Sequence, residues 1–103
     1  MDLQCSEVVS QVRKLSMRVF VPGLEELVRL IGSDKFDGLS EARIGMIGDY
    51  HPIEIGGERF FGRAFSASKE AAAILRLAKG QDLPGRKAIL AELRSLLAAL
   101  KVT

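Results

Sequence analysis

The strongest constraint on the fold comes from two adjacent glycines, Gly56-Gly57, which separate two short runs of alternating apolar and polar residues. Such a pair supplies positive φ at both central positions of a two-residue turn, and this geometry matches the twist of paired strands. We therefore expect a β-hairpin in which residues 51–55 pair with residues 58–65. The stretch 49–66 around it holds the only Tyr, the only His and three of the five Phe.

The second strand of this hairpin carries apolar residues on both of its expected faces. Successive side chains of a strand point to opposite faces, so Arg59, Phe61 and Arg63 should share one face. Phe60 should take the other face. We therefore expect either a sheet that is partly covered on both sides or a hairpin with one exposed aromatic side chain.

Outside the hairpin, apolar residues recur at helical spacing. This periodicity predicts four main helices, at residues 3–20, 23–31, 67–79 and 84–101. Ser66 or Ser68 should cap the third of these helices, and Asp82 or Leu83 should cap the fourth. We expect the last two helices to form an antiparallel pair. Their apolar content, AAAILRLA followed by ILAELRSLLAAL, exceeds what one chain needs and indicates a homodimer through these helices.

The residue pattern of segment 39–48 is compatible with either a helix or a strand. Ser40 is a good helix N-cap, and the residues that follow it suit a short helix. Gly45 and Gly48 each disfavour a helix by about 1 kcal/mol relative to Ala. As a strand, the segment would put Ile44 and Met46 on one face. We favour a short helix that runs into a strand.

The chain of 103 residues, 48% of them hydrophobic and 27% charged, suits an ordered globular protein. We expect one small α+β domain over residues 1–103: four main helices with a small antiparallel hairpin or a three-stranded sheet, and the helices mainly on one sheet face. No apolar run approaches the roughly 20 residues of a membrane span, so we expect no membrane partner. The single cysteine, Cys5, suits a reducing compartment, and we expect a cytoplasmic protein.

Catalytic and metal-binding patterns are weak. Asp49 and His51 are the one acid-base pair near the hairpin, but side chains so close in sequence point apart and no nucleophile motif accompanies them. Asp34 and Asp37 do not have the spacing of a calcium-binding EF-hand. The sequence contains neither GxGxxG nor a Walker lysine. We therefore assign no catalytic residue, no metal and no cofactor, and keep a small enzyme using His51 and Asp49 as an alternative.

The best candidate for a binding surface lies on the hairpin, where cations and aromatic residues alternate. Residues 51–103 carry nine Lys or Arg against five Asp or Glu, so the basic surplus lies at the hairpin and after it. The leading hypothesis is a non-enzymatic binding or interaction domain, such as a small adaptor, regulator or accessory protein, that binds a protein or a small ligand. The candidate binding residues are Tyr50, His51, Arg59, Phe61 and Arg63.

The order of these elements resembles the layout of winged-helix regulators. In that resemblance, residues 24–31 would be the positioning helix, 40–47 the recognition helix and Gly56-Gly57 the wing tip. It implies DNA binding with C-terminal dimerisation helices, which we keep as an alternative. Two features oppose nucleic acid as the partner: Arg43 is the one cation of the recognition helix, and residues 1–50 carry six Lys or Arg against eight Asp or Glu.

Overall fold

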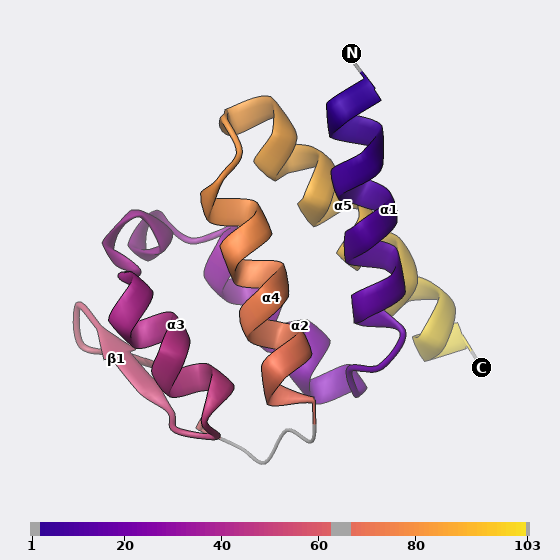
Figure 1. Ribbon diagram of the computed structural model, residues 1–103. Helices are drawn as coiled ribbons and strands as arrows, with labels where there is room; N and C mark the ends of the chain where they lie inside the picture. The colour runs from indigo at the N-terminus through magenta and orange to yellow at the C-terminus, as the bar shows by residue number, and fades with distance from the viewer. Residues whose placement is uncertain (1–2, 63–66, 103) are drawn as a thin grey trace.

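The structure is a computed structural model that describes residues 3–62 and 67–102 (Figure 1). Its elements are, in order, α1 (Leu3–Ser16), α2 (Val21–Ile31), the 3-10 helix η1 (Asp34–Gly38), α3 (Glu41–Gly48), β1 (Ile53–Ile55), β2 (Glu58–Phe60), α4 (Ser68–Lys79) and α5 (Leu83–Val102). The described residues thus form a mostly helical α+β fold with five α-helices and one two-stranded antiparallel sheet. The predicted fold class is confirmed, with one α-helix more than the four main helices expected.

The additional helix is α3, and the predicted change from helix to strand within residues 39–48 is wrong. The Ser40 hydroxyl caps the helix by accepting a hydrogen bond from the Arg43 N–H at 3.2 Å. A Cβ atom on Gly48 would lie 3.4 Å from the Cβ of Ala72, so Gly48 lies where α3 packs against α4. Burial of Ile44 and Ile47 offsets the low helix propensity of the glycines.

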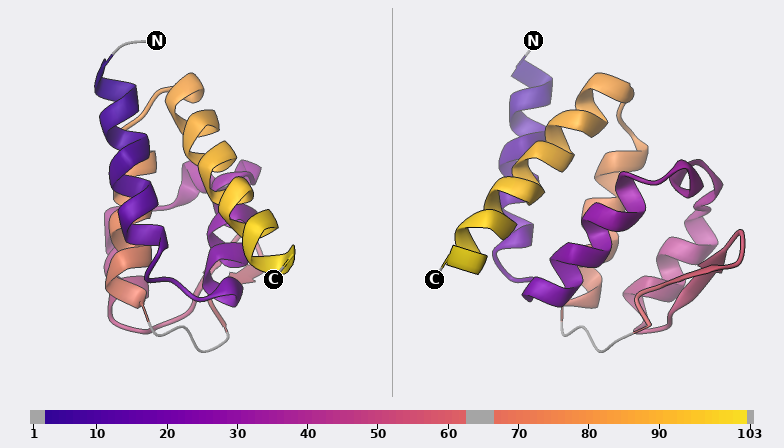
Figure 2. Two further views of the ribbon diagram at one scale, coloured as in Figure 1. Left: turned by 90° about the vertical axis from the view of Figure 1, so that its right-hand side faces the viewer. Right: turned by 180° about the vertical axis from the view of Figure 1, so that it is seen from behind.

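Helix α4 lies at the centre of the fold and packs most extensively on α3 and α1, whereas α5 packs most extensively on α1 and α2 (Figures 1 and 2). The antiparallel pairing of the last two helices therefore stays a prediction. The end of α5 lies beside the start of α2, where Lys101 and Glu25 form an ion pair at 3.0 Å. The hairpin lies at the opposite edge of the molecule, next to α3 (Figure 1).

The first connection differs from the predicted helix 3–20, because α1 ends at Ser16. The Ser16 hydroxyl donates a hydrogen bond to the Arg13 carbonyl, and the backbone then turns so that Val19 is buried. Phe20 stands at the N-cap of α2, where it makes no side-chain capping hydrogen bond, and Pro22 lies in the first turn. This position favours Ser, Thr, Asp or Asn, so Phe20 is an unusual cap.

The two C-terminal helices begin differently from each other. Asp82 caps α5, as predicted, by accepting a hydrogen bond from the Gly85 N–H at 3.0 Å. Ser68 was predicted as a cap of α4, but its buried hydroxyl instead donates to the Gly48 carbonyl at 3.0 Å and ties α4 to α3. The other predicted cap, Ser66, lies outside the described residues.

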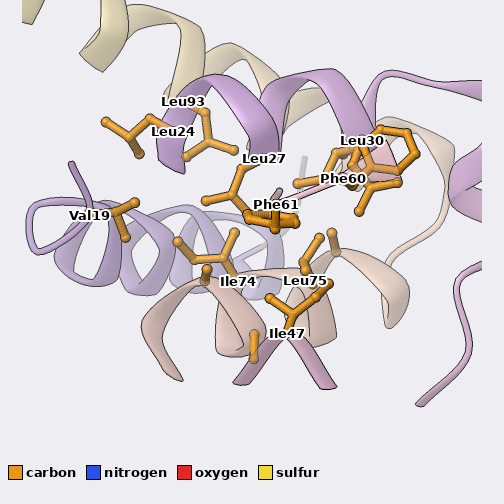
Figure 3. Packing of buried hydrophobic residues seen from close by; sticks show 14 of the residues in the cluster. Val19, Leu24, Leu27, Leu30, Ile47, Phe60, Phe61, Ile74, Leu75 and Leu93 are labelled. Carbon is orange, nitrogen blue, oxygen red and sulfur yellow. The ribbon is translucent and has the colours of Figure 1, made fainter. Parts of the chain in front are cut away.

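The core lies where the five α-helices and the hairpin meet, and Figure 3 shows part of it. Each fully buried aliphatic or aromatic side chain stabilises the fold by about 1.5–3 kcal/mol relative to an exposed one. Phe36, the one large apolar residue of η1, is fully buried, and the cations of Lys79 and Arg86 lie 5.1 and 4.7 Å from its ring centre. Other side chains of the core are those of Leu24, Leu27, Leu30, Ile47, Phe60, Phe61, Ile74 and Leu75.

Within the described ranges, no helix combines the length and the apolar character that crossing a membrane requires.

Candidate binding surface at the hairpin

The hairpin has the predicted turn but shorter strands than expected. Gly56 and Gly57 have φ angles of 56° and 81°, which confirms positive φ at both turn positions. Residues 53 to 55 of β1 pair with residues 60 to 58 of β2, and Glu54 lies directly opposite Arg59. Ile53 and Phe60 are buried, while Glu54 and Arg59 are exposed, so the sheet has one core face and one solvent face.

Phe61 does not lie on the face predicted for it. Its φ angle of 59° ends the strand alternation directly after Phe60, and its side chain is only 2% exposed. Figure 3 shows its ring among Leu27, Ile74 and Leu75. Both consecutive phenylalanines therefore point into the core, and Phe61 is a core residue rather than a contact residue of the surface.

Two side chains of α2 hold the outer side of β2. The Phe61 N–H donates to Glu26 Oε1 at 2.7 Å, and Arg29 Nη2 donates to the Arg59 carbonyl at 2.6 Å. Arg29 also pairs with Glu26 and Glu58, and its guanidinium lies 4.2 Å from the ring centre of Phe60. Its hydrogen bonds to Glu26 raise the pKa of Arg29 above the ordinary value of an arginine.

Tyr50 occupies the position that ends α3. The Tyr50 N–H donates to the Ile47 carbonyl and the His51 N–H donates to the Met46 carbonyl, which together form a Schellman motif. The residue at this position adopts a left-handed conformation, and Tyr50 has a φ angle of 67°. Glycine is the usual residue here because a Cβ atom is unfavourable at such φ angles. The Tyr50 side chain is nevertheless 59% exposed.

Met46 is a surface residue that the sequence did not identify. It is 44% exposed and lies in the last turn of α3, whereas Ile44 is buried. The prediction of a strand hid this exposure, because it placed Met46 on the same face as Ile44. A helical interpretation of residues 41–48 would have found it.

Arg59 points along the hairpin toward its base. A Cβ atom on Gly62 would lie 3.2 Å from Arg59 Nε, so the arginine side chain crosses directly over Gly62. The chain leaving α3 and the chain leaving β2 lie side by side at this base (Figures 1 and 2). His51, which is exposed, lies in the first of these segments. We call Met46, Tyr50, His51 and Arg59 the α3–hairpin surface.

Other groups considered for chemistry remain dispersed. Across residues 3–62 and 67–102, no three His, Cys, Asp or Glu side chains come together as a metal site. Asp49 caps the C-terminus of α3 and is exposed, as is His51. A depression of about 310 Å³ lies on α1, remote from the hairpin, and is lined by Ser6, Val9, Ser10 and Arg13.

The outer face of α3 carries little positive charge. Glu41 and Asp49 are exposed on this helix, and Arg43 turns back to donate to the Gly38 carbonyl at 3.5 Å. Such a face repels phosphate groups more than it attracts them.

Three of the five predicted binding residues, Tyr50, His51 and Arg59, are therefore exposed around the α3–hairpin connection. Phe61 lies in the core, and Arg63 lies outside the described residues. Searches against protein-family models, curated proteins and solved structures found no match to this chain.

Proposed function

We propose that this protein is a non-enzymatic interaction domain, a small adaptor, regulator or accessory protein, that binds another protein through the α3–hairpin surface. One observation carries the proposal: Tyr50, a large aromatic residue, is 59% exposed at a backbone position with a φ angle of 67°. The other members of the surface, Met46, His51 and Arg59, surround the same connection.

The position of Tyr50 supports a role beyond folding. A left-handed conformation costs about 1–2 kcal/mol for a residue with a Cβ atom, and glycine avoids this cost. A mostly exposed side chain recovers little of it through burial. Strained residues of this kind occur preferentially at functional sites.

The composition of the surface also supports protein binding. Tyrosine, methionine and arginine are enriched at protein interfaces, and tyrosine and arginine are common among the residues that dominate binding energy. Tyr50 and Met46 provide exposed apolar area at and just after the end of α3, and His51 and Arg59 provide exposed polar groups on the next connection and on β2.

The test is a selection of binders from a random-peptide display library on the immobilised protein. Affinities of the selected peptides are then measured for the wild type, for Tyr50→Ser and for a matched control, Phe20→Ser. Phe20 is also an exposed aromatic residue, but it lies at the α1–α2 connection. We expect Tyr50→Ser to weaken binding by about tenfold or more, because loss of a dominant contact changes affinity by that amount. Phe20→Ser should leave affinity unchanged.

Two outcomes would contradict the proposal. One is a selection that enriches no peptide above the level found with an unrelated immobilised protein. The other is a set of peptides whose affinity does not change in Tyr50→Ser or in Arg59→Ala. The second result would mean that peptides bind elsewhere on the molecule.

Winged-helix DNA binding is the alternative with less support, because the exposed side chains of α3 include Glu41 and Asp49. A gel shift on mixed-sequence duplexes tests it, and a salt-dependent shift would favour it over the leading proposal. A small enzyme using His51 and Asp49 is the third alternative. It requires a substrate cleft around two side chains that are both exposed.

A homodimer through α4 and α5 is a separate proposal. The exposed Leu83 and Val102, near the two ends of α5, support it. Burial of Ile74, Leu75, Ile89 and Leu93 weakens it, because the monomer already uses this apolar surface. A monomeric mass by light scattering at micromolar concentration would contradict the dimer and leave the interaction domain intact.

A further inference from the structure

The two outer edges of the hairpin differ in how their backbone groups are paired. In an antiparallel pair, residues alternate between those that hydrogen-bond to the partner strand and those that direct N–H and C=O outward. A two-residue turn closes on a hydrogen-bonded pair, which here is Ile55 with Glu58. Glu54 and Arg59 form the next pair, so their backbone groups point to the outer edges.

Side chains of α2 close the outer edge of β2. Arg29 donates to the Arg59 carbonyl, and Glu26 accepts from the Phe61 N–H. Together these two side chains provide β2 with one donor and one acceptor, as the backbone of a neighbouring strand would. A further strand therefore cannot pair with β2 unless both α2 side chains are displaced.

No side chain of the described residues hydrogen-bonds to the outer edge of β1 in this way. In the described part of the chain, no hydrogen bond joins the backbone N–H or C=O of Glu54 to another element, and β2 is the one strand that pairs with β1. The Pro52 carbonyl and the Gly56 N–H point to the same side as the backbone groups of Glu54, because outward-pointing groups recur at every second residue of the strand. Proline lacks an N–H, so Pro52 leaves no unpaired donor at the start of this edge.

We propose that the outer edge of β1 binds an extended segment of a partner protein, which pairs with Glu54 as a third strand of the sheet. This inference rests on the proposed function and specifies its mode of recognition. Backbone hydrogen bonds to an exposed sheet edge give affinity, and alternate side chains give specificity. Tyr50 and His51 lie shortly before β1 in the chain.

Charge selects a partner segment over a second copy of this chain. Antiparallel pairing of two β1 strands about a two-fold axis at Glu54 would place the two Glu54 side chains opposite each other, and like charges in that position are destabilising. A segment with Lys or Arg opposite Glu54 forms a favourable pair instead. We therefore infer an extended segment with a central cation and apolar residues on the side facing Ile53 and Ile55.

The probe is the blocked heptapeptide acetyl-Val-Thr-Val-Lys-Val-Thr-Val-amide, titrated into the whole protein and followed by amide NMR and hydrogen exchange. We expect the amides of Glu54 and Gly56 to become protected from exchange. A probe with N-methyl-lysine at the centre lacks the N–H for the Glu54 carbonyl and should bind about tenfold more weakly. A probe with central Glu should bind about threefold more weakly, as expected for loss of an exposed cross-strand charge pair.

Two protein variants separate the backbone from the side chain. Glu54→Pro removes the outward N–H without breaking the ladder to β2, so it should abolish probe binding while the thermal midpoint stays close to that of the wild type. Glu54→Gln keeps the N–H, so it should retain binding but lose the preference for Lys over Glu at the probe centre. If Glu54→Pro fails to fold, the N-methyl probe gives the same information on the wild type.

Failure of this inference can be distinguished from failure of the proposed function. Library peptides that depend on Tyr50 but bind Glu54→Pro normally would overturn strand pairing and leave the interaction domain intact. Absence of probe binding at millimolar concentration, or binding without protection at Glu54 and Gly56, would also overturn it. A dimeric mass with Glu54 protected in the free protein would instead assign this edge to a second copy.

Discussion

The tip and the base of the hairpin both use left-handed backbone, but with different residues. At the tip, Gly56 and Gly57 have φ angles of 56° and 81°, which glycine adopts without strain. At the base, Tyr50 and Phe61 have φ angles of 67° and 59°, although both carry large side chains. The tip follows the local preferences of its residues and the base opposes them.

The difference shows that something other than local preference holds the base. For Phe61 the cause is visible, because its ring is buried and its N–H is bonded to Glu26. Tyr50 is mostly exposed, so burial explains little of its presence. Positions where a sequence opposes its own local preference are commonly functional, and this reasoning separates Tyr50 from Phe61.

Replacement of Phe61 should have the largest effect on stability. Phe61→Ala leaves a cavity among Leu27, Ile74 and Leu75, and loss of a buried phenylalanine costs about 3–5 kcal/mol. Urea unfolding followed by circular dichroism measures the change. Phe61→Leu, which refills part of the cavity, should lose less. A loss below about 1 kcal/mol for Phe61→Ala would mean that burial does not hold the strained backbone.

Glu26 should have the next largest effect, because it provides the acceptor for the Phe61 N–H. Glu26→Ala leaves that donor without its partner, at a cost of about 1–3 kcal/mol in the free energy of unfolding. Glu26→Gln retains an acceptor oxygen and is the matched control, with a smaller loss. Equal losses in the two variants would show that the negative charge, through Arg29, matters more than the hydrogen bond.

Replacement of a glycine at the tip by alanine should destabilise the protein, whereas replacement of Tyr50 by glycine should not. A Cβ atom on Gly57 would meet no other atom within 4 Å, so Gly57→Ala changes backbone strain alone. We expect a loss of about 1 kcal/mol in the free energy of unfolding, because alanine disfavours the left-handed conformation. An unchanged value would show that the turn accommodates alanine by changing its type.

The parts of the fold that could be predicted are those where local signals agree with packing. The Gly56-Gly57 turn and the cap at Ser40 followed from residue types alone. The prediction for residues 39–48 was wrong in part because its two glycines disfavour a helix. Burial of Ile44 and Ile47 and the hydrogen bond from Ser68 to the Gly48 carbonyl stabilise this helix, and they depend on residues far away in the sequence.

The candidate site was predictable in position but not in detail. Tyr50, His51 and Arg59 were identified because rare aromatic and charged residues gather near the hairpin. Phe61 was misassigned because strand alternation assumes an extended backbone, and nothing in its residue type signals a φ angle of 59°. Cover of the β2 edge by Glu26 and Arg29 depends on tertiary packing of α2, which sequence patterns do not reveal.

The most direct test of the account is Tyr50→Gly, with unfolding and peptide binding measured on the same preparation. Glycine relieves the strained φ angle but adds entropy to the unfolded chain, so the free energy of unfolding should stay the same or rise by up to about 1 kcal/mol. Affinity for the selected library peptides should fall by about tenfold or more. A variant that loses more than about 1 kcal/mol of stability and still binds these peptides normally would contradict the account, because Tyr50 would then serve the fold rather than a partner.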